Sequence, residues 1–217
     1  MSKSYQVLVV GGGAAGLATA ASLKKRDGSL EVAVVEPSDK HYYQPGWTMV
    51  GAGVFTKEDT IKDTDSIWPS DVIRIKDEVI KFDPKNNKVT LGNKTEVGYE
   101  MLVVASGLKL DWEAIEGLSE SLGENGVTSN YRYDLAPYTW ELVQEMNGKN
   151  AIFTQPPMPI KCAGAPQKAM YLSCDHWQKS GQLEGMNVSF CNAGPVLFGC
   201  ATYVPPLMKY VEKYGIN

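Results

Sequence analysis

A glycine-rich turn near the N-terminus constrains the fold of this chain more than any other feature. The apolar run Tyr5–Val10 ends in Gly11-Gly-Gly-Ala-Ala-Gly16, a G-x-G-x-x-G pattern, and a helix-like stretch follows. A second apolar run then ends at Glu36, twenty residues after Gly16. A strand, a glycine turn, a helix and a second strand that ends in an acid predict a βαβ unit with a dinucleotide site.

Each residue of this pattern has a mechanical reason for its place. Gly11 permits the tight turn, Gly13 lets a pyrophosphate approach the backbone, and Gly16 lets the helix lie close to the sheet. The helix N-terminus offers unpaired N–H groups and the positive end of its dipole to phosphate. Glu36 is placed to accept hydrogen bonds from a ribose diol. A glycine-rich turn without a ligand is the alternative, but it leaves the flanking strands and the acid unexplained.

Composition narrows the possible partners. The chain has 217 residues, 43% of them hydrophobic, and a net charge of −4 without a basic stripe, so we expect no nucleic-acid partner. No apolar run is long enough to span a membrane, and the first strand begins too early for a signal or transit peptide. The four cysteines lack paired C-x-x-C spacing and only two histidines are present, so we expect free thiols and no metal site.

The middle of the chain indicates which dinucleotide. Three β-like runs between Val72 and Tyr99, separated by turns at 83–87 and 92–94, predict an antiparallel meander. The apolar run 101–105 predicts a buried parallel strand, and it ends in Ser106-Gly107, where the backbone can approach a ligand closely. Dehydrogenase domains that bind NAD alone usually lack such a meander, so residues 1–112 are interpreted as the first segment of an FAD-binding domain.

A second unit follows a connection at residues 113–147. Helices at 135–146, 165–179 and 205–214 and strands at 150–154 and 186–191 predict that residues 148–217 begin a second Rossmann-like domain with a parallel sheet. The loop Asn192–Gly199, which follows its second strand, contains Pro195, Leu197 and Phe198 and is not a phosphate-binding pattern. We therefore expect an α/β fold of two doubly wound units, both incomplete at the C-terminal side, without an NAD(P)H site in the second.

Cys162 is the candidate catalytic residue. It lies between a predicted strand and a predicted helix, next to Lys161, and both the ammonium and the helix N-terminus favour the thiolate. The small residues that follow it leave room for a sulfur substrate or a flavin ring, and a thiolate beside a flavin can attack sulfur and donate two electrons. An inert buried thiol is the alternative for Cys162, and it is our expectation for Cys174, Cys191 and Cys200.

At these residues the chain resembles sulfide:quinone oxidoreductases, in the branch of the mitochondrial enzyme and its bacterial relatives. The resemblance covers nearly the whole chain. It is carried by Val34-Val-Glu-Pro-Ser38, His41-Tyr-Tyr-Gln-Pro45, Val50-Gly-Ala-Gly53, Leu102-Val-Val-Ala-Ser-Gly107, Ser129-Asn-Tyr131 and Ile160-Lys-Cys-Ala-Gly-Ala-Pro-Gln-Lys168.

The resemblance implies a site and a reaction. It places Ala14, Ala15, Glu36, Gln44 and Val79 at FAD-contacting positions and makes Cys162 one of two redox cysteines. In this family sulfide is oxidised to a cysteine-bound persulfide, and the electrons pass through FAD to a quinone in the membrane.

The chain also departs from the family pattern. Family members are longer, and this chain lacks the late Gly-Asp segment that closes over FAD, the second redox cysteine, and the C-terminal region that docks on the membrane and forms the quinone site. We therefore expect an N-terminal half with weak FAD affinity and little turnover alone. The expected location of the protein is peripheral, on the cytoplasmic face of a bacterial inner membrane or on the mitochondrial inner membrane.

Two other functions remain open on the sequence alone. An NAD(P)H-dependent flavin disulfide or quinone reductase would want a second G-x-G-x-x-G near residue 192, and the disulfide reductases a close cysteine pair; both are missing. A non-catalytic truncated protein with a flavin-binding fold is the third interpretation.

Overall fold

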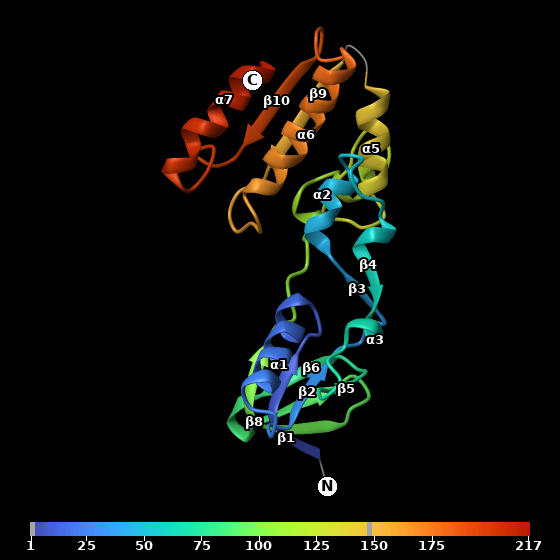
Figure 1. Cartoon of the computed structure of the whole chain (residues 1–217), viewed down its shortest axis with the longest axis vertical. Coiled ribbons are helices and arrows are strands. Elements are labelled where there is room, and N and C mark those ends of the chain that lie inside the picture. The colour runs from blue at the N-terminus through green and yellow to red at the C-terminus, as the bar shows by residue number, and fades with distance from the viewer. Residues whose placement is uncertain (1–2, 147–148) are drawn as a thin grey trace. The chain divides into compact units, whose positions relative to one another are not determined.

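The computed structural model describes residues 3–146 and 149–217, which form two compact units (Figure 1). The first unit consists of Met1–Tyr43 and Ile61–Trp112, and the second of Gln44–Thr60 and Glu113–Asn217. Residues 44–60, placed in the first domain on the sequence alone, therefore group with the second unit. The boundary between the predicted ranges 113–147 and 148–217 lies outside the described residues, and those ranges stay a proposal.

The first unit is built on one six-stranded sheet with the order β5-β2-β1-β8-β7-β6. Strands β5, β2, β1 and β8 run parallel, whereas β7 and β6 continue the sheet antiparallel. Strands β3 and β4 form a separate antiparallel pair. The elements of this unit are β1 (Lys3–Val10), α1 (Ala14–Arg26), β2 (Val32–Val35), β3 (Lys40–Tyr42), β4 (Ile61–Asp63), α3 (Thr64–Ile67), β5 (Ile73–Ile75), β6 (Val79–Asp83), η3 (Pro84–Asn86), β7 (Lys88–Leu91) and β8 (Glu96–Val104).

Burial on both faces explains the unbroken apolar runs at the centre of this sheet. Val32 and Val34 of β2 share a core cluster with Ala20 of α1, whereas Ala33 and Val35 belong to the cluster on the opposite face. All four residues of β2 are buried. Such runs are typical of parallel strands covered on both sides. The α/β class with a Rossmann-type parallel sheet is confirmed.

The meander is confirmed in part. Strands β6, β7 and β8 are antiparallel neighbours, as predicted, but Ile73–Ile75 belongs to a different part of the sheet, parallel to β2 at the opposite edge. The β-like run that begins at Val72 is interrupted after Ile75 by a turn at Asp77. The N–H of Asp77 donates to the carbonyl of Ile75 at 3.0 Å, and the Asp77 carboxylate accepts from the N–H of Glu78 at 2.8 Å. The last strand of the meander and the strand expected at 101–105 are one continuous strand, β8, because β8 pairs with β1 from Val97 to Val104.

The second unit contains the predicted second βαβ arrangement. Strands β9 and β10 are parallel, from Asn187 opposite Asn150 to Asn192 opposite Gln155, and α6 connects them (Figure 1). The elements of this part of the chain are η1 (Gln44–Gly46), α2 (Trp47–Val50), η2 (Glu58–Thr60), η4 (Trp112–Ala114), α4 (Leu118–Ser121), α5 (Ala136–Glu145), β9 (Asn150–Gln155), α6 (Gly164–Ser180), β10 (Asn187–Asn192), η5 (Ala201–Tyr203) and α7 (Val204–Tyr214).

Helix α6 supplies the centre of the second core. Met170, Cys174 and Trp177 lie on its buried side and share a cluster with Ala151 of β9 and Val188 of β10. The indole N–H of Trp177 donates to the carbonyl of Val143 at 2.8 Å, so the buried ring leaves no unpaired donor. This core fixes α6, and therefore the residues just before its first turn.

Among the described residues, no helix has the length and the apolar content needed to cross a membrane.

Candidate functional site

The glycine loop between β1 and α1 is shaped by two close backbone approaches. Gly11 has a φ of +100°, and a Cβ atom there would lie 2.5 Å from the carbonyl oxygen of Ala105. A Cβ atom at Gly16 would lie 1.8 Å from the carbonyl oxygen of Gly11. Both contacts are to backbone atoms, which cannot move aside without displacing a strand end. Only glycine therefore fits at these two positions.

The same loop leaves a cradle for an anionic group. A Cβ atom at Gly13 would meet nothing within 4 Å, so the space beside this residue is open. Gly13 offers no side-chain cap to α1, and the first helical bond is from the N–H of Leu17 to the carbonyl of Gly13 at 3.0 Å. The amides of Ala14, Ala15 and Gly16 thus have no partner within the helix. Open space and unpaired N–H donors fit the pyrophosphate of a dinucleotide.

Glu36 ties the end of β2 to the glycine loop. Its Oε2 atom accepts from the N–H of Gly12 at 2.7 Å, and its Oε1 atom accepts from the N–H of Ser38 at 2.7 Å. A carboxylate has about four acceptor positions, so two bonds leave capacity for a ribose diol. The sequence did not predict the bond to Gly12. The sequence signal that could have revealed this bond is Gly12 itself, because a Cβ atom at Gly12 would lie 2.7 Å from the Cβ atom of Glu36.

Gly107 and Val79, two further predicted contacts of FAD, belong to the same unit as the glycine loop. The N–H of Ala105, two residues before Gly107, donates to the carbonyl of Val10 at 2.7 Å, and Gly107 has a φ of +73° with open space around it. Val79 begins β6 and packs against the core cluster of the sheet. It follows Ile75, whose carbonyl accepts from the N–H of Glu36 at 3.0 Å, by four residues.

Gln44 and the Cys162 segment meet in the second unit, although 117 positions separate Gln44 from Lys161. The ammonium of Lys161 donates to Oε1 of Gln44 and lies 5.4 Å from the centre of the Tyr131 ring. The hydroxyl of Tyr131 donates to the carbonyl of Lys161 at 2.6 Å. The sequence placed Tyr131 in a family motif but did not predict this contact.

Cys162 is exposed and adopts a left-handed backbone conformation, with a φ of +61°. It lies two residues before α6 begins, and its carbonyl accepts from the N–H of Ala165 at 2.9 Å. The exposed thiol does not match the inert buried alternative. Burial and the negative charge of the Cys162 thiolate both raise the pKa of Tyr131, which indicates that the two groups are within electrostatic reach.

The other cysteines divide into two groups. Cys174 is fully buried, as predicted, and burial raises the pKa of its thiol to about 12. The prediction of burial is wrong for Cys191 and Cys200, which are exposed. Cys191 occupies an exposed position of β10, and Cys200 lies in the loop before η5. Within the described ranges no three His, Cys, Asp or Glu side chains are grouped to hold a metal.

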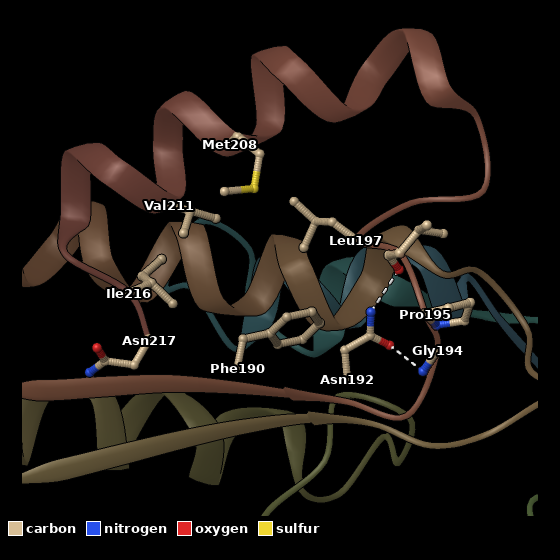
Figure 2. Close-up of a pocket in the computed structure, with 10 residues that line it drawn as sticks. Phe190, Asn192, Gly194, Pro195, Leu197, Met208, Val211, Ile216 and Asn217 are labelled. Carbon is tan, nitrogen blue, oxygen red and sulfur yellow. Dashed lines mark hydrogen bonds between the residues drawn. The ribbon is translucent and has the colours of Figure 1, made fainter.

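The loop after β10 closes on itself (Figure 2). The side chain of Asn192 accepts from the N–H of Gly194 at 2.9 Å and donates to the carbonyl of Val196 at 2.7 Å. Together with α7 the loop borders a pocket of about 230 Å³ lined by Phe190, Asn192, Gly194, Pro195, Val196, Leu197, Met208, Val211, Ile216 and Asn217. In a glycine-rich loop the N–H of Gly194 would be available to bind a phosphate, but here it is already paired with Asn192. The neighbouring Pro195, Val196 and Leu197 side chains are apolar.

The fold and the glycine loop agree with the comparisons to known proteins. The family model described as pyridine nucleotide-disulphide oxidoreductase matches residues 5–141. The chain belongs to this family.

Within that family the resemblance to sulfide:quinone oxidoreductases is confirmed. The chain is 41% identical over 214 residues to the mitochondrial sulfide:quinone oxidoreductase of Dictyostelium discoideum, a match that covers 98% of this chain and 47% of that protein. It is 39% identical over 213 residues to that of Mus musculus, with the same two coverages. The chain therefore spans about half the length of the curated relatives it matches.

A solved structure shows the same fold. The sulfide:quinone oxidoreductase of Aquifex aeolicus matches with a TM-score of 0.80 at 22% identity, covering 100% of this chain and 50% of that one.

Proposed function

We propose that the polypeptide carrying this chain oxidises sulfide to a persulfide on Cys162 and passes the electrons through FAD to a membrane quinone. One observation carries the proposal. In a chain about 40% identical to two mitochondrial sulfide:quinone oxidoreductases, Cys162 is exposed just before α6 and follows a lysine that contacts Gln44 and Tyr131.

The residues of the glycine loop fit FAD. The amides and open space at Gly11, Gly13, Ala14, Ala15 and Gly16 would hold the pyrophosphate, and Glu36 the ribose. Gln44, Val79 and Gly107 are proposed as further contacts. Bound FAD would take up the two electrons released when sulfide sulfur bonds to Sγ of Cys162 and would hand them to the quinone. Cys162 itself would supply the thiolate, form the S–S bond and carry the sulfur until an acceptor removes it.

The relatives support the quinone as electron acceptor and a location for the protein. The relatives from Dictyostelium discoideum and Mus musculus are both named as mitochondrial enzymes. We therefore propose a peripheral position on the mitochondrial inner membrane, in preference to the bacterial location that the sequence left open. Docking on the membrane would use a part of the polypeptide outside this chain.

The loop after β10 disfavours NAD(P)H as the electron source. Its Asn192 side chain already occupies the N–H of Gly194, and Pro195 and Leu197 lie where a pyrophosphate would need open backbone (Figure 2). A reductase fed by a pyridine nucleotide requires a glycine-rich loop at this point.

The two electron donors can be compared directly. We expect sulfide, added anaerobically to the FAD-loaded polypeptide, to bleach the flavin absorbance, whereas NADH and NADPH at the same concentration leave it unchanged over the same time. Stopped-flow absorbance spectroscopy measures both. Rapid bleaching by NADH with a slow response to sulfide would reject the proposed function and favour the pyridine-nucleotide reductase.

A further inference from the structure

Tyr131 contacts the residue before Cys162 in two ways. Its hydroxyl donates to the carbonyl oxygen of Lys161 at 2.6 Å, across 30 positions of sequence. Its ring lies 5.4 Å from the ammonium of the same lysine, which also donates to Oε1 of Gln44. One tyrosine thus fixes both the backbone and the side chain of Lys161.

Cys162 needs such support because of its backbone conformation. A φ of +61° is disfavoured for residues other than glycine, since the Cβ atom approaches the backbone carbonyl. On the C-terminal side, the segment is held by the N–H of Ala165 and by Gln167, a buried side chain whose Nε2 atom donates to the carbonyl of Leu197 at 2.6 Å. On the N-terminal side the described structure provides the Tyr131 hydroxyl.

We propose that Tyr131 is a positioning residue for Cys162. By fixing Lys161, it holds the exposed thiol in the left-handed conformation, two residues before α6 begins. The inference rests on the proposed role of Cys162 and extends it to a residue with no role assigned by the sequence. The hydroxyl of Tyr131 is protonated and able to donate at neutral pH, because the ordinary pKa of a phenol is near 10 and burial raises the pKa of Tyr131 further.

Thiol labelling tests this inference without sulfide, quinone or turnover. The variant is Tyr131→Phe in the full polypeptide, because phenylalanine keeps the ring below the ammonium and removes only the hydroxyl. Iodoacetamide labels thiolates, and trypsin separates Cys162 in the peptide 162–168 from Cys174 in 169–179, so mass spectrometry follows each thiol. Cys174 serves as the internal reference because it is buried.

At neutral pH we expect Cys162 to be labelled about three- to tenfold more slowly in Tyr131→Phe, the effect of losing one hydrogen bond that holds the reactive conformation. Labelling of Cys174 should be unchanged. Tyr138→Phe is the matched control, because its hydroxyl accepts from the N–H of Gly126 at 3.1 Å, away from the Cys162 segment. The control should leave both rates unchanged.

Equal Cys162 labelling in Tyr131→Phe and the parent protein would overturn the inference. So would faster labelling of Cys174, because general loosening of the unit would then account for the change. The two proposals can fail separately. If Cys162 is labelled more slowly in Tyr131→Phe but sulfide does not reduce the flavin of the parent protein, the positioning role is supported and the proposed function is rejected.

Discussion

Gly16→Ala is expected to abolish stoichiometric FAD binding and to lower the unfolding temperature of the polypeptide. The new methyl group would lie 1.8 Å from the carbonyl oxygen of Gly11, so the glycine loop and α1 must separate. Gly11 cannot yield easily, because its own position is fixed against Ala105. Overpacking of this kind costs about 1–3 kcal/mol of unfolding free energy. Calorimetry and titration with FAD, followed by flavin fluorescence, measure the two effects.

Two further glycine-to-alanine changes separate folding from binding. Gly13→Ala adds a methyl group where nothing lies within 4 Å, so the unfolding temperature should hold while FAD affinity falls about tenfold or more, because the methyl group occupies the pyrophosphate space. Gly28→Ala, where the nearest atom would be the carbonyl oxygen of Lys24 at 3.9 Å, should change neither quantity. Unchanged FAD affinity in both Gly13→Ala and Gly16→Ala would place the cofactor elsewhere.

Cys162→Ser should reduce sulfide-dependent quinone reduction by about a thousandfold or more, because a serine hydroxyl is neither ionised at neutral pH nor able to carry persulfide sulfur. FAD binding should persist, since the glycine loop is unchanged. The measurement is quinone reduction at saturating sulfide, with the flavin spectrum as the check on cofactor content.

Cys191→Ser is the matched control for this variant. It makes the same substitution at another exposed cysteine, and turnover should stay close to that of the parent protein. Near-normal turnover of Cys162→Ser, or an equal loss in Cys191→Ser, would reject Cys162 as the residue that carries sulfur.

Local patterns explain why much of the fold could be predicted. Strand β1, the glycine loop and α1 follow one another in the sequence, and each can be recognised from its own residues. The same holds for the βαβ arrangement of β9, α6 and β10, where apolar runs and a helix of seventeen residues leave few alternatives. Ile73–Ile75 was misplaced because a strand of three residues carries almost no periodicity, and the turn after it depends on the Asp77 side chain.

The candidate site could be predicted only in its local parts. Gly11, Gly16 and Glu36 follow from the spacing of one motif. The bond between Lys161 and Gln44 joins residues 117 positions apart, and the Tyr131 hydroxyl reaches Lys161 across 30 positions, so neither leaves a pattern in the sequence. The left-handed conformation of Cys162 was also unexpected, because nothing in its residue type favours a positive φ.

We expect Cys162 to receive the sulfur when sulfide is oxidised. The most direct measurement adds one equivalent of sulfide anaerobically to the FAD-loaded polypeptide, quenches with an alkylating agent, and determines the mass of the peptide 162–168. We predict a gain of one sulfur atom on this peptide, in step with bleaching of the flavin. Bleaching without sulfur on Cys162, or sulfur found only on another cysteine, would contradict the account.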